Sequence, residues 1–398
     1  MSRRPRAAHL VCDQCSGVVV VEAGSQSGVC EQCQNVVTLD SGLRGEALIR
    51  RYVGSLSNSS PRELYGRLEE LGYRGQDRAR RAVCLAAYRH IRRLQRIYLD
   101  QEDRLRIPVK PNSLLMGPTG CGKTFLIELL FREILKIPTV VVDVTNYSET
   151  GYIGEDTRTI LTRLVYAADG VPELASCGVV ALDEFDKLAS SSNTARFAGE
   201  GTTKDVSGFG VQRELLAMLE GSDVLVPLDF GYSHYGSRVS LPTRDITFFA
   251  CGAFSGYSEL HFKRTRGEQL GFRNRPERRF KEGVAYLLEE QDAQDIESFQ
   301  AFGFIPELIA RFTRIVPFEP LDRDTLRAIL VDNVLSRFVS EFHGEGIELT
   351  VEPRVLDALV AACLKRQTGA RGLHAGLTRA LEDAAFDSFR QDGVSRVL

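Results

Sequence analysis

Residues Gly117–Thr124 read GPTGCGKT and stand between an apolar run, NSLLM, and a helical run, FLIELLFREIL. A Gly-x-x-x-x-Gly-Lys-Thr loop leaves backbone N–H groups free to converge on phosphate oxygens, and the following helix presents its positive end to the same charge. Lys123 would reach the outer phosphates, and the Thr124 hydroxyl would bind Mg²⁺. The pattern therefore predicts an ATP site rather than an ordinary tight turn. The predicted loop consists of Gly117, Pro118, Thr119, Gly120, Cys121, Gly122, Lys123 and Thr124.

The stretch GVVALDEFDK supplies the acidic groups that such a loop requires. Its apolar residues lead a strand to its carboxyl end, where Asp183 would complete the Mg²⁺ shell and Glu184 would polarise the attacking water. Alone, an acidic strand end would favour a solvated turn. Together with the phosphate loop it predicts nucleotide hydrolysis.

Four cysteines near the start of the chain, Cys12, Cys15, Cys30 and Cys33, form two Cys-x-x-Cys pairs. This spacing is typical of a zinc ribbon in which four thiolates fill the tetrahedral shell, so the predicted Zn²⁺ is structural rather than catalytic. The flanking stretches SGVVVVEAGSQSG and QNVVTLD read as a small β-ribbon. A segment this short has too little core to fold without such a metal.

The elements that must position these groups follow from the patterning. Strand-like runs, NSLLM, TVVVDV, CGVVALD and ITFFACGAF, alternate with helical segments and predict an α/β fold with a parallel sheet flanked by helices. The Ser- and Gly-rich stretch SGLRGEALIRRYVGSLSNSSP predicts a flexible linker. Beyond RIVPFEPL the pattern is mainly helical, with one short strand-like piece, IELTVE. The predicted domains are a zinc-binding domain (1–40), a linker (41–61), a large α/β ATPase domain (62–320) and a small helical domain (321–398).

Composition narrows the function classes. The chain has 398 residues and 43% hydrophobic residues, enough for two or three domains. Fifty basic residues against fifty-three acidic ones give a net charge of -3, which by itself indicates neither a nucleic-acid nor a membrane partner. The basic start, MSRRPRAAHL, lacks the apolar core of a signal peptide, and no apolar run approaches a membrane span. We therefore expect a cytoplasmic protein with reduced thiols.

The order of motifs resembles the ClpX branch of the AAA+ Clp family over roughly residues 61 to 390. The motifs are GYRGQ, GPTGCGKT, ETGYIGED, LDEFDK, KDVSGFGVQRELLAMLEG, FGFIPELIARF and TGARGL. This resemblance implies an AAA+ ATPase that assembles into a homohexameric ring and threads protein substrates through a central pore.

The resemblance also implies roles that spacing alone could not assign. Arg311 matches the finger that reaches the nucleotide of a neighbouring subunit, and Arg371 matches the sensor that contacts the outer phosphate from the small domain. Gly75 and Gln76, in GYRGQ, match the adenine-side segment. Without the family context both arginines would be ordinary surface residues.

Two further segments match surfaces that touch polypeptides. Tyr152 and Ile153, between two glycines, match the pore loop that grips the substrate, although the family usually has Val at the second position. A packed turn is the alternative. The stretch NTARFAGEGTTKDVSGFGVQ resembles the second pore loop, whereas DFGYSHYGSRV lacks the Arg-Lys-His tripeptide of the family's pore entrance.

Leu270, Gly271 and Phe272 resemble the tripeptide that docks the family into clefts of the peptidase ClpP. They lie in a basic stretch, HFKRTRGEQLGFRNRPERRF, that is otherwise typical of a solvated loop or a nucleic-acid patch. The residue after Phe272 is Arg273, where the family usually has Gly.

Three functions remain open on the sequence. The first is an unfoldase that feeds a ClpP-type peptidase, and the second is a stand-alone remodeller of protein complexes. The third is a nucleic-acid motor, against which the balanced charge and the aromatic pore loop argue. A ring of the HslU type is disfavoured because no long inserted domain follows the pore loop. The four-cysteine segment differs from the family's zinc domain in its inner spacing, so an adaptor is only a candidate partner for it.

Overall fold

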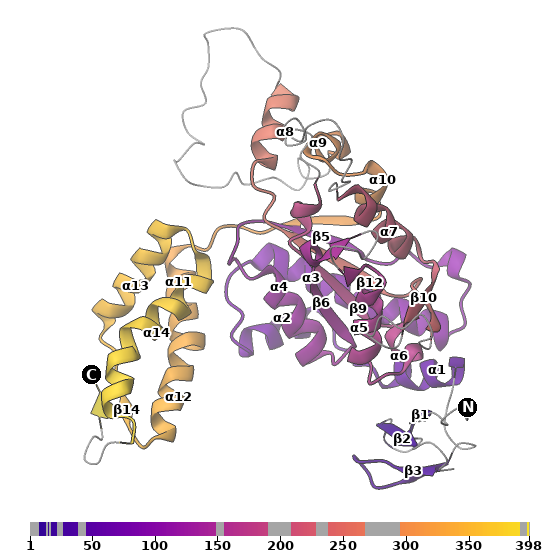
Figure 1. The fold of residues 1–398 in the computed structure, drawn as a ribbon, viewed down its shortest axis with the longest axis horizontal. Coiled ribbons are helices and arrows are strands. Elements are labelled where there is room, and N and C mark those ends of the chain that lie inside the picture. Colours follow the sequence, from indigo (N-terminus) through magenta and orange to yellow (C-terminus); the bar gives the residue numbers. More distant parts are fainter. Residues whose placement is uncertain are drawn as a thin grey trace, which may run out of the picture.

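The computed structural model of the chain describes residues 8–12, 15, 17–21, 27–38, 45–148, 155–189, 208–227, 238–266, 295–390 and 396–397. They form a β-ribbon, a large α/β domain and a small helical domain (Figure 1). Among these residues, no helix combines the length and apolar composition needed to cross a membrane.

A parallel five-stranded sheet in the order β13-β5-β12-β9-β6 is the centre of the large domain. Its strands are β5 (Ser113–Met116), β6 (Thr139–Asp143), β9 (Val179–Asp183), β12 (Thr247–Gly252) and β13 (Arg314–Pro317). The first four confirm the strands predicted from the sequence. The fifth was missed because the run RIVP is short and stops at a proline.

Helices cover both faces of this sheet. They are α1 (Gly45–Ser55), α2 (Pro61–Glu70), α3 (Asp77–Tyr98), α4 (Lys123–Ile127) with a π-helical continuation (Glu128–Ile134), α5 (Thr159–Ala167), α6 (Pro172–Ala175), α7 (Phe209–Glu220), α8 (Tyr257–Arg266), α9 (Ile296–Phe302) and α10 (Pro306–Ile309). Short strands β7 (Tyr147–Ser148), β8 (Glu155–Asp156), β10 (Asp223–Pro227) and β11 (Arg238–Pro242) lie outside the sheet. Neighbouring strand residues such as Leu114 and Leu115 alternate between two apolar cores. One core packs against α5 to α7 and the other against α2 to α4.

The flexible linker predicted for residues 41–61 is corrected by α1. This helix buries Leu48 and Val53, one in each core of the large domain. The Ser- and Gly-rich flanks obscured an amphipathic segment whose apolar side chains pack against the large domain. Residues 45–55 are therefore part of the folded body.

The small domain has its own core and confirms the predicted helical region. Its elements are α11 (Arg323–Ile329), a π-helical turn (Leu330–Leu335), α12 (Ser336–Gly344), β14 (Glu348–Leu349), α13 (Pro353–Arg366), α14 (Gly369–Ser388) and β15 (Arg396–Val397). Leu321 packs against this core and against one core of the large domain. The hinge between the domains is thus anchored by an apolar side chain.

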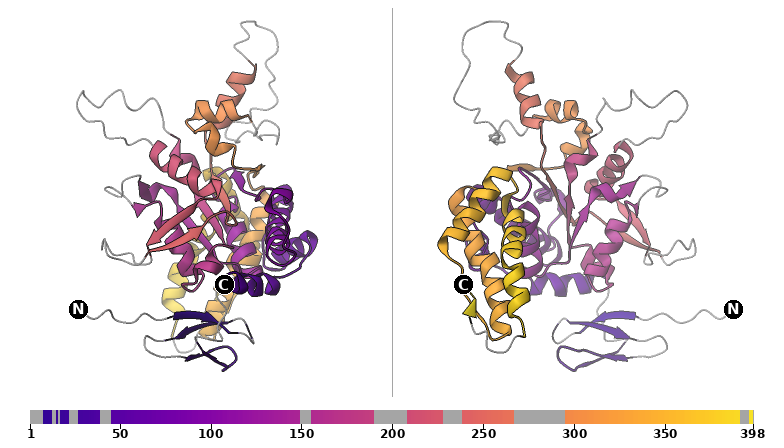
Figure 2. Two further views of the ribbon diagram at one scale, coloured as in Figure 1. Left: turned by 90° about the vertical axis from the view of Figure 1, so that its right-hand side faces the viewer. Right: turned by 60° about the vertical axis from the view of Figure 1, so that its left-hand side comes forward.

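Two antiparallel hairpins form the N-terminal ribbon, as predicted. β1 (Ala8–Val11) pairs with β2 (Val18–Val21), and β3 (Ser27–Val29) pairs with β4 (Val36–Thr38). Their core contains Cys12, Val19, Val21, Cys30 and Val37. Figures 1 and 2 show the ribbon at the end of the molecule opposite α8 and α9.

A buried carboxylate, Asp245, links the end of α3 to the segment that precedes β12. Arg104 donates to both of its oxygens at 2.6 and 2.8 Å, and the Tyr98 hydroxyl donates at 2.7 Å. Burial raises the pKa of Asp245, but these hydrogen bonds outweigh burial and leave the pKa below its usual value. Arg93, 3.7 Å away, adds further positive charge.

We expect Asp245→Asn to lower the free energy of unfolding by about 3 kcal/mol, because it removes the buried negative charge that the partly buried Arg93 and Arg104 pair with. Denaturant titration of the purified chain measures this loss. The matched control is Asp223→Asn. Asp223 and its partner Arg244 are both about half exposed, so this variant should lower the free energy of unfolding by less than about 1 kcal/mol. Equal losses for the two variants would contradict the assignment of Asp245 as a structural anchor.

Candidate functional site

The phosphate loop connects β5 to α4 and folds back on its own lysine. Gly120 and Gly122 adopt left-handed backbone angles, with φ of +77° and +94°. Lys123 Nζ donates to the carbonyl oxygens of Gly117 and Pro118 at 2.7 and 2.9 Å. Burial raises the pKa of the adjacent Cys121 thiol, so this thiol brings no negative charge to a loop suited to phosphate.

Asp183, the last residue of β9, lies beside the start of α4. The Thr124 hydroxyl donates to its Oδ2 at 2.8 Å, and the backbone N–H of Glu184 donates to its Oδ1 at 2.9 Å. Glu184 has a φ of +54°, a left-handed conformation that non-glycine residues adopt at some cost and that is concentrated at functional sites. A hydroxyl and a carboxylate at this separation fit a Mg²⁺ ion that accompanies nucleotide phosphates.

A cavity of about 390 Å³ unites these groups with the small domain. Its lining residues come from the phosphate loop and α4, from the ends of β9 and β12, and from four helical segments of the small domain: α11, the π-helical turn, α12 and α14. They are Thr119, Gly120, Gly122, Lys123, Thr124, Phe125, Asp183, Glu184, Gly252, Ala253, Ile329, Asn333, Val334, Arg337, Ala370, Arg371 and His374. Figure 1 shows the α11–α14 bundle on the side of the sheet that carries α2 and α4. The structure thus brings Arg371 to the same cavity as Lys123 and Glu184.

Two glycines meet where the phosphate loop touches the start of α14. The backbone N–H of Ala370 donates to the Gly120 carbonyl oxygen at 3.0 Å. A Cβ on Gly120 would lie 2.7 Å from the Thr368 carbonyl oxygen, and a Cβ on Gly369 would lie 2.7 Å from the Gly120 carbonyl oxygen. Side chains are excluded from both sides of this contact, so both motifs need glycine here.

The GYRGQ segment lies at the junction of the two domains. The Gln76 amide binds the backbone of Glu319 twice, donating to its carbonyl oxygen at 2.6 Å and accepting from its N–H at 3.0 Å. A Cβ on Gly75 would lie 2.8 Å from a methyl group of Thr325 in α11. The Tyr73 hydroxyl donates to the Gly122 carbonyl oxygen at 3.2 Å. Gly75 and Gln76 are not among the described residues that line the cavity; they hold its hinge.

Arg311, two residues after the end of α10, is also absent from the described lining of its own chain's cavity. Its guanidinium forms an ion pair with Glu220, at the end of α7, and both side chains are about half exposed. Tyr152, Ile153, Leu270, Gly271 and Phe272 lie outside the described residues.

Some lining residues were missed by the sequence analysis. Asn333, Arg337 and His374 come from helices of the small domain without a recognisable motif. The available signal was weak: Asn333 and Arg337 are four residues apart and so share one helix face. Asp186, also missed, is buried and accepts the Ala253 N–H at 3.1 Å, which fixes the end of β12 at the cavity.

The four N-terminal cysteines converge. All four sulfur atoms lie within 4.8 Å of one another. The two halves of the site are alike: Cys12 N–H donates to Gly17 O and Cys30 N–H donates to Asn35 O, each at 2.8 Å. Such a donor set fits a tetrahedral metal ion such as zinc.

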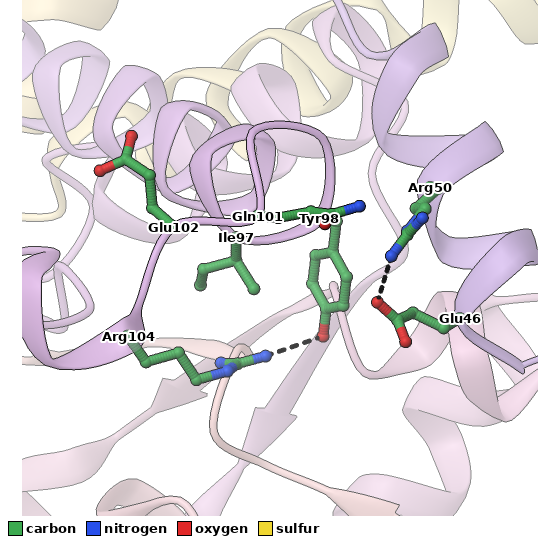
Figure 3. A pocket seen from close by; sticks show the side chains of 7 residues that line it. All are labelled: Glu46, Arg50, Ile97, Tyr98, Gln101, Glu102 and Arg104. Carbon is green, nitrogen blue, oxygen red and sulfur yellow. Dashed lines mark hydrogen bonds and ion pairs between the residues drawn. The ribbon is translucent and has the colours of Figure 1, made fainter.

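A second cavity, about 430 Å³ in volume, lies between α1 and the end of α3 (Figure 3). Its lining residues are Glu46, Arg50, Ile97, Tyr98, Gln101, Glu102 and Arg104. Glu46 pairs with Arg50 at 2.9 Å, Glu102 pairs with Arg96 at 2.6 Å, and Arg104 is held by the buried carboxylate described above. Because these charges are paired with one another, the second cavity lacks the phosphate-binding chemistry of the first.

Comparison with known proteins agrees with this geometry. Residues 110–315 match the family described as AAA domain (Cdc48 subfamily), and residues 321–395 match the C-terminal, D2-small domain of ClpB protein. The chain is 36% identical over 319 residues to the ATP-dependent Clp protease ATP-binding subunit ClpX of Porphyromonas gingivalis, covering 78% of this chain and 74% of that protein. It is 35% identical over 323 residues to the protein of the same name from Bacteroides fragilis, covering 80% and 74%.

The chain belongs to the ClpX family of AAA+ ATPases. The family accounts for the ATP-binding AAA domain and for the helical domain that closes the cavity.

We expect Gly120→Ala to weaken ATP binding by about tenfold or more, because alanine is strained at this φ and its Cβ would push the loop away from α14. Titration with a fluorescent ATP analogue measures the dissociation constant. Gly66→Ala is the matched control, since a Cβ at Gly66 meets nothing within 4 Å. Unchanged affinity in Gly120→Ala would show that the contact with α14 does not shape the site.

Proposed function

We propose that this chain is an ATP-dependent protein unfoldase that assembles into a homohexameric ring and moves polypeptides through a central pore. The observation that carries the proposal is the cavity itself, whose walls come from both the large and the small domain. A change in the occupant of such a cavity changes the angle between the domains, which converts hydrolysis into mechanical movement. Membership of the ClpX family supports the same function.

The residues would divide the work as follows. The loop N–H groups and Lys123 hold the phosphates, and Thr124 with Asp183 holds Mg²⁺, which when bound offsets phosphate charge. Glu184 orients the attacking water and accepts its proton. Arg371 contacts the outer phosphate from α14.

Arg311 is proposed to act on the nucleotide of the neighbouring subunit. Its half-exposed position, outside the described lining of its own cavity, supports a role in a neighbour's site. An arginine supplied in this way is worth about 10³ to 10⁵ in rate, so an isolated subunit should turn over ATP very slowly.

We further propose that Tyr152 and Ile153 grip the polypeptide and that Leu270, Gly271 and Phe272 dock a ClpP-type peptidase. The relatives are ATP-binding subunits of Clp protease by name, which supports the second assignment. A cytoplasmic location fits such a partnership. The domain division into residues 1–40, 62–320 and 321–398, with α1 added to the large domain, completes the proposal.

For the N-terminal ribbon we propose a structural Zn²⁺ held by Cys12, Cys15, Cys30 and Cys33. The convergence of four sulfur atoms supports this. With the metal in place, the outer surface of the ribbon is free to bind an adaptor.

Glu184→Gln should bind ATP with near-normal affinity but lose hydrolysis by at least about 10²-fold, since it removes the group that activates water. Unfolding of a tagged fluorescent reporter should stop with it. ATP turnover and loss of reporter fluorescence are measured in parallel, with Glu345→Gln, on the exposed surface of the small domain, as control. Unfolding that persists in Glu184→Gln, or an active ATPase that unfolds no tagged reporter, would contradict the proposal.

If the chain feeds a ClpP-type peptidase, Glu184→Gln in the presence of ATP should capture that peptidase. If the chain is a stand-alone remodeller, Glu184→Gln should capture no peptidase.

Cys30→Ser should lower bound zinc from one ion per chain to well below one, because one thiolate of the tetrahedral set is lost. Metal analysis of the purified protein measures this. Cys363→Ser, at a buried cysteine of the small domain, should retain the full zinc content. Equal zinc in both variants would exclude the four-cysteine site.

A further inference from the structure

Helix α7 contacts the segment that carries Arg311 near both of its ends. Near its start, the fully buried Gln212 uses both donors and the acceptor of its amide. It donates to Leu188 O at 2.8 Å and to Gly303 O at 3.1 Å, and it accepts the Ile305 N–H at 2.8 Å. Leu188 ends the turn that begins after Glu184, and Ile305 precedes α10. One side chain therefore joins the catalytic turn to the helix that leads to Arg311.

Aromatic packing joins the same two segments. The Phe185 ring, next to Glu184, stacks on Phe304 with centroids 5.2 Å apart and meets Phe312 edge-on at 5.5 Å. Phe304 and Phe312 flank α10, and Phe312 directly follows Arg311. Because all three rings are buried, the backbone on both sides of α10 is fixed relative to Glu184.

At its other end, α7 holds the guanidinium group. Glu220 is the last residue of the helix, and its carboxylate forms the ion pair with Arg311. Gly221, with a φ of +95°, ends the helix there, and a Cβ at that position would lie 3.1 Å from Arg244 Cα. The negative end of the helix dipole adds to the carboxylate charge at this place. Gln212 and Glu220 are eight residues apart, so the two anchor points are separated by about 12 Å along a rigid helix.

We propose that Glu220 is a positioning residue for Arg311, and that α7 is the support that ties the arginine finger to the catalytic turn of its own subunit. This rests on the proposed role of Arg311 in the neighbouring subunit's site. A long arginine side chain has many conformations, and a carboxylate partner reduces the number it samples before assembly. An exposed ion pair contributes little to stability, so a purely structural role predicts almost no effect of its loss.

Glu220→Ala provides the clean test, because replacement of the buried Gln212 would disturb folding. We expect the ATPase kcat of the assembled protein to fall about 10- to 100-fold with unchanged thermal stability and little change in KM. Glu220→Gln keeps a hydrogen-bond acceptor and should fall between Glu220→Ala and the natural chain. Glu70→Ala is the matched control, since Glu70 is also an exposed glutamate at the last position of a helix.

Rings assembled from two different variants show which subunit carries the ATPase defect. In rings formed from equal amounts of Glu220→Ala and Glu184→Gln chains, an intact catalytic site can lie next to an intact finger. Turnover per Glu220→Ala chain should therefore rise several-fold above that of Glu220→Ala alone. Arg311→Ala is mixed with Glu184→Gln in the same way and tests the finger itself.

The outcomes separate the two proposals. Rescue of both variants supports both. If mixing rescues Arg311→Ala, two results overturn the positioning role of Glu220 and leave the finger role of Arg311 intact. Either Glu220→Ala alone has a normal or raised rate, or its rate falls and mixing does not restore it. Failure to rescue Arg311→Ala overturns the finger, and the role of Glu220 with it.

Discussion

The contact between two glycines, one in the phosphate loop and one at the start of α14, constrains the rest of this structure. Gly120 and Gly369 approach so closely that neither can carry a side chain, and the Ala370 N–H donates to the Gly120 carbonyl oxygen across the contact. The large and small domains thus meet backbone to backbone at the loop suited to phosphates. Arg371, one residue farther along α14, is delivered to the cavity by the same contact.

Other contacts join the two domains near the same place. Gln76 binds the backbone of Glu319 in the connection, and Leu321 packs against cores on both sides of it. Asn333, on the small domain, donates to the Gly72 carbonyl oxygen at 2.8 Å. An ion pair between Arg74 and Asp332, at 2.8 Å, lies in the same region. On the other face of the sheet, α7 and the Phe185 ring connect the turn after Glu184 to the segment that carries Arg311.

The sequence predicted those parts of the fold that depend on local pattern. Four of the five sheet strands, the phosphate loop, the acidic end of β9 and the cysteine pairs were predicted because each combines residue type with fixed spacing. Residues whose roles depend on distant partners were not predicted. Gln212 has partners 24 and 91 residues away, Glu220 pairs across 91 residues, and Asn333 donates to Gly72 across 261 residues. The predicted linker failed for the same reason, because Leu48 and Val53 acquire their meaning only from the cores they enter.

The small domain supplies one wall of the cavity to which we assign ATP. The chain contains no tryptophan, so a single introduced tryptophan reports on one position. His374→Trp places this reporter on the small-domain wall, and Phe125→Trp places it on the large-domain wall. We expect a saturable fluorescence change on ATP addition at both positions, with the same dissociation constant, and the loss of both signals when Lys123→Ala is added. A response at position 125 without one at position 374 would contradict this assignment.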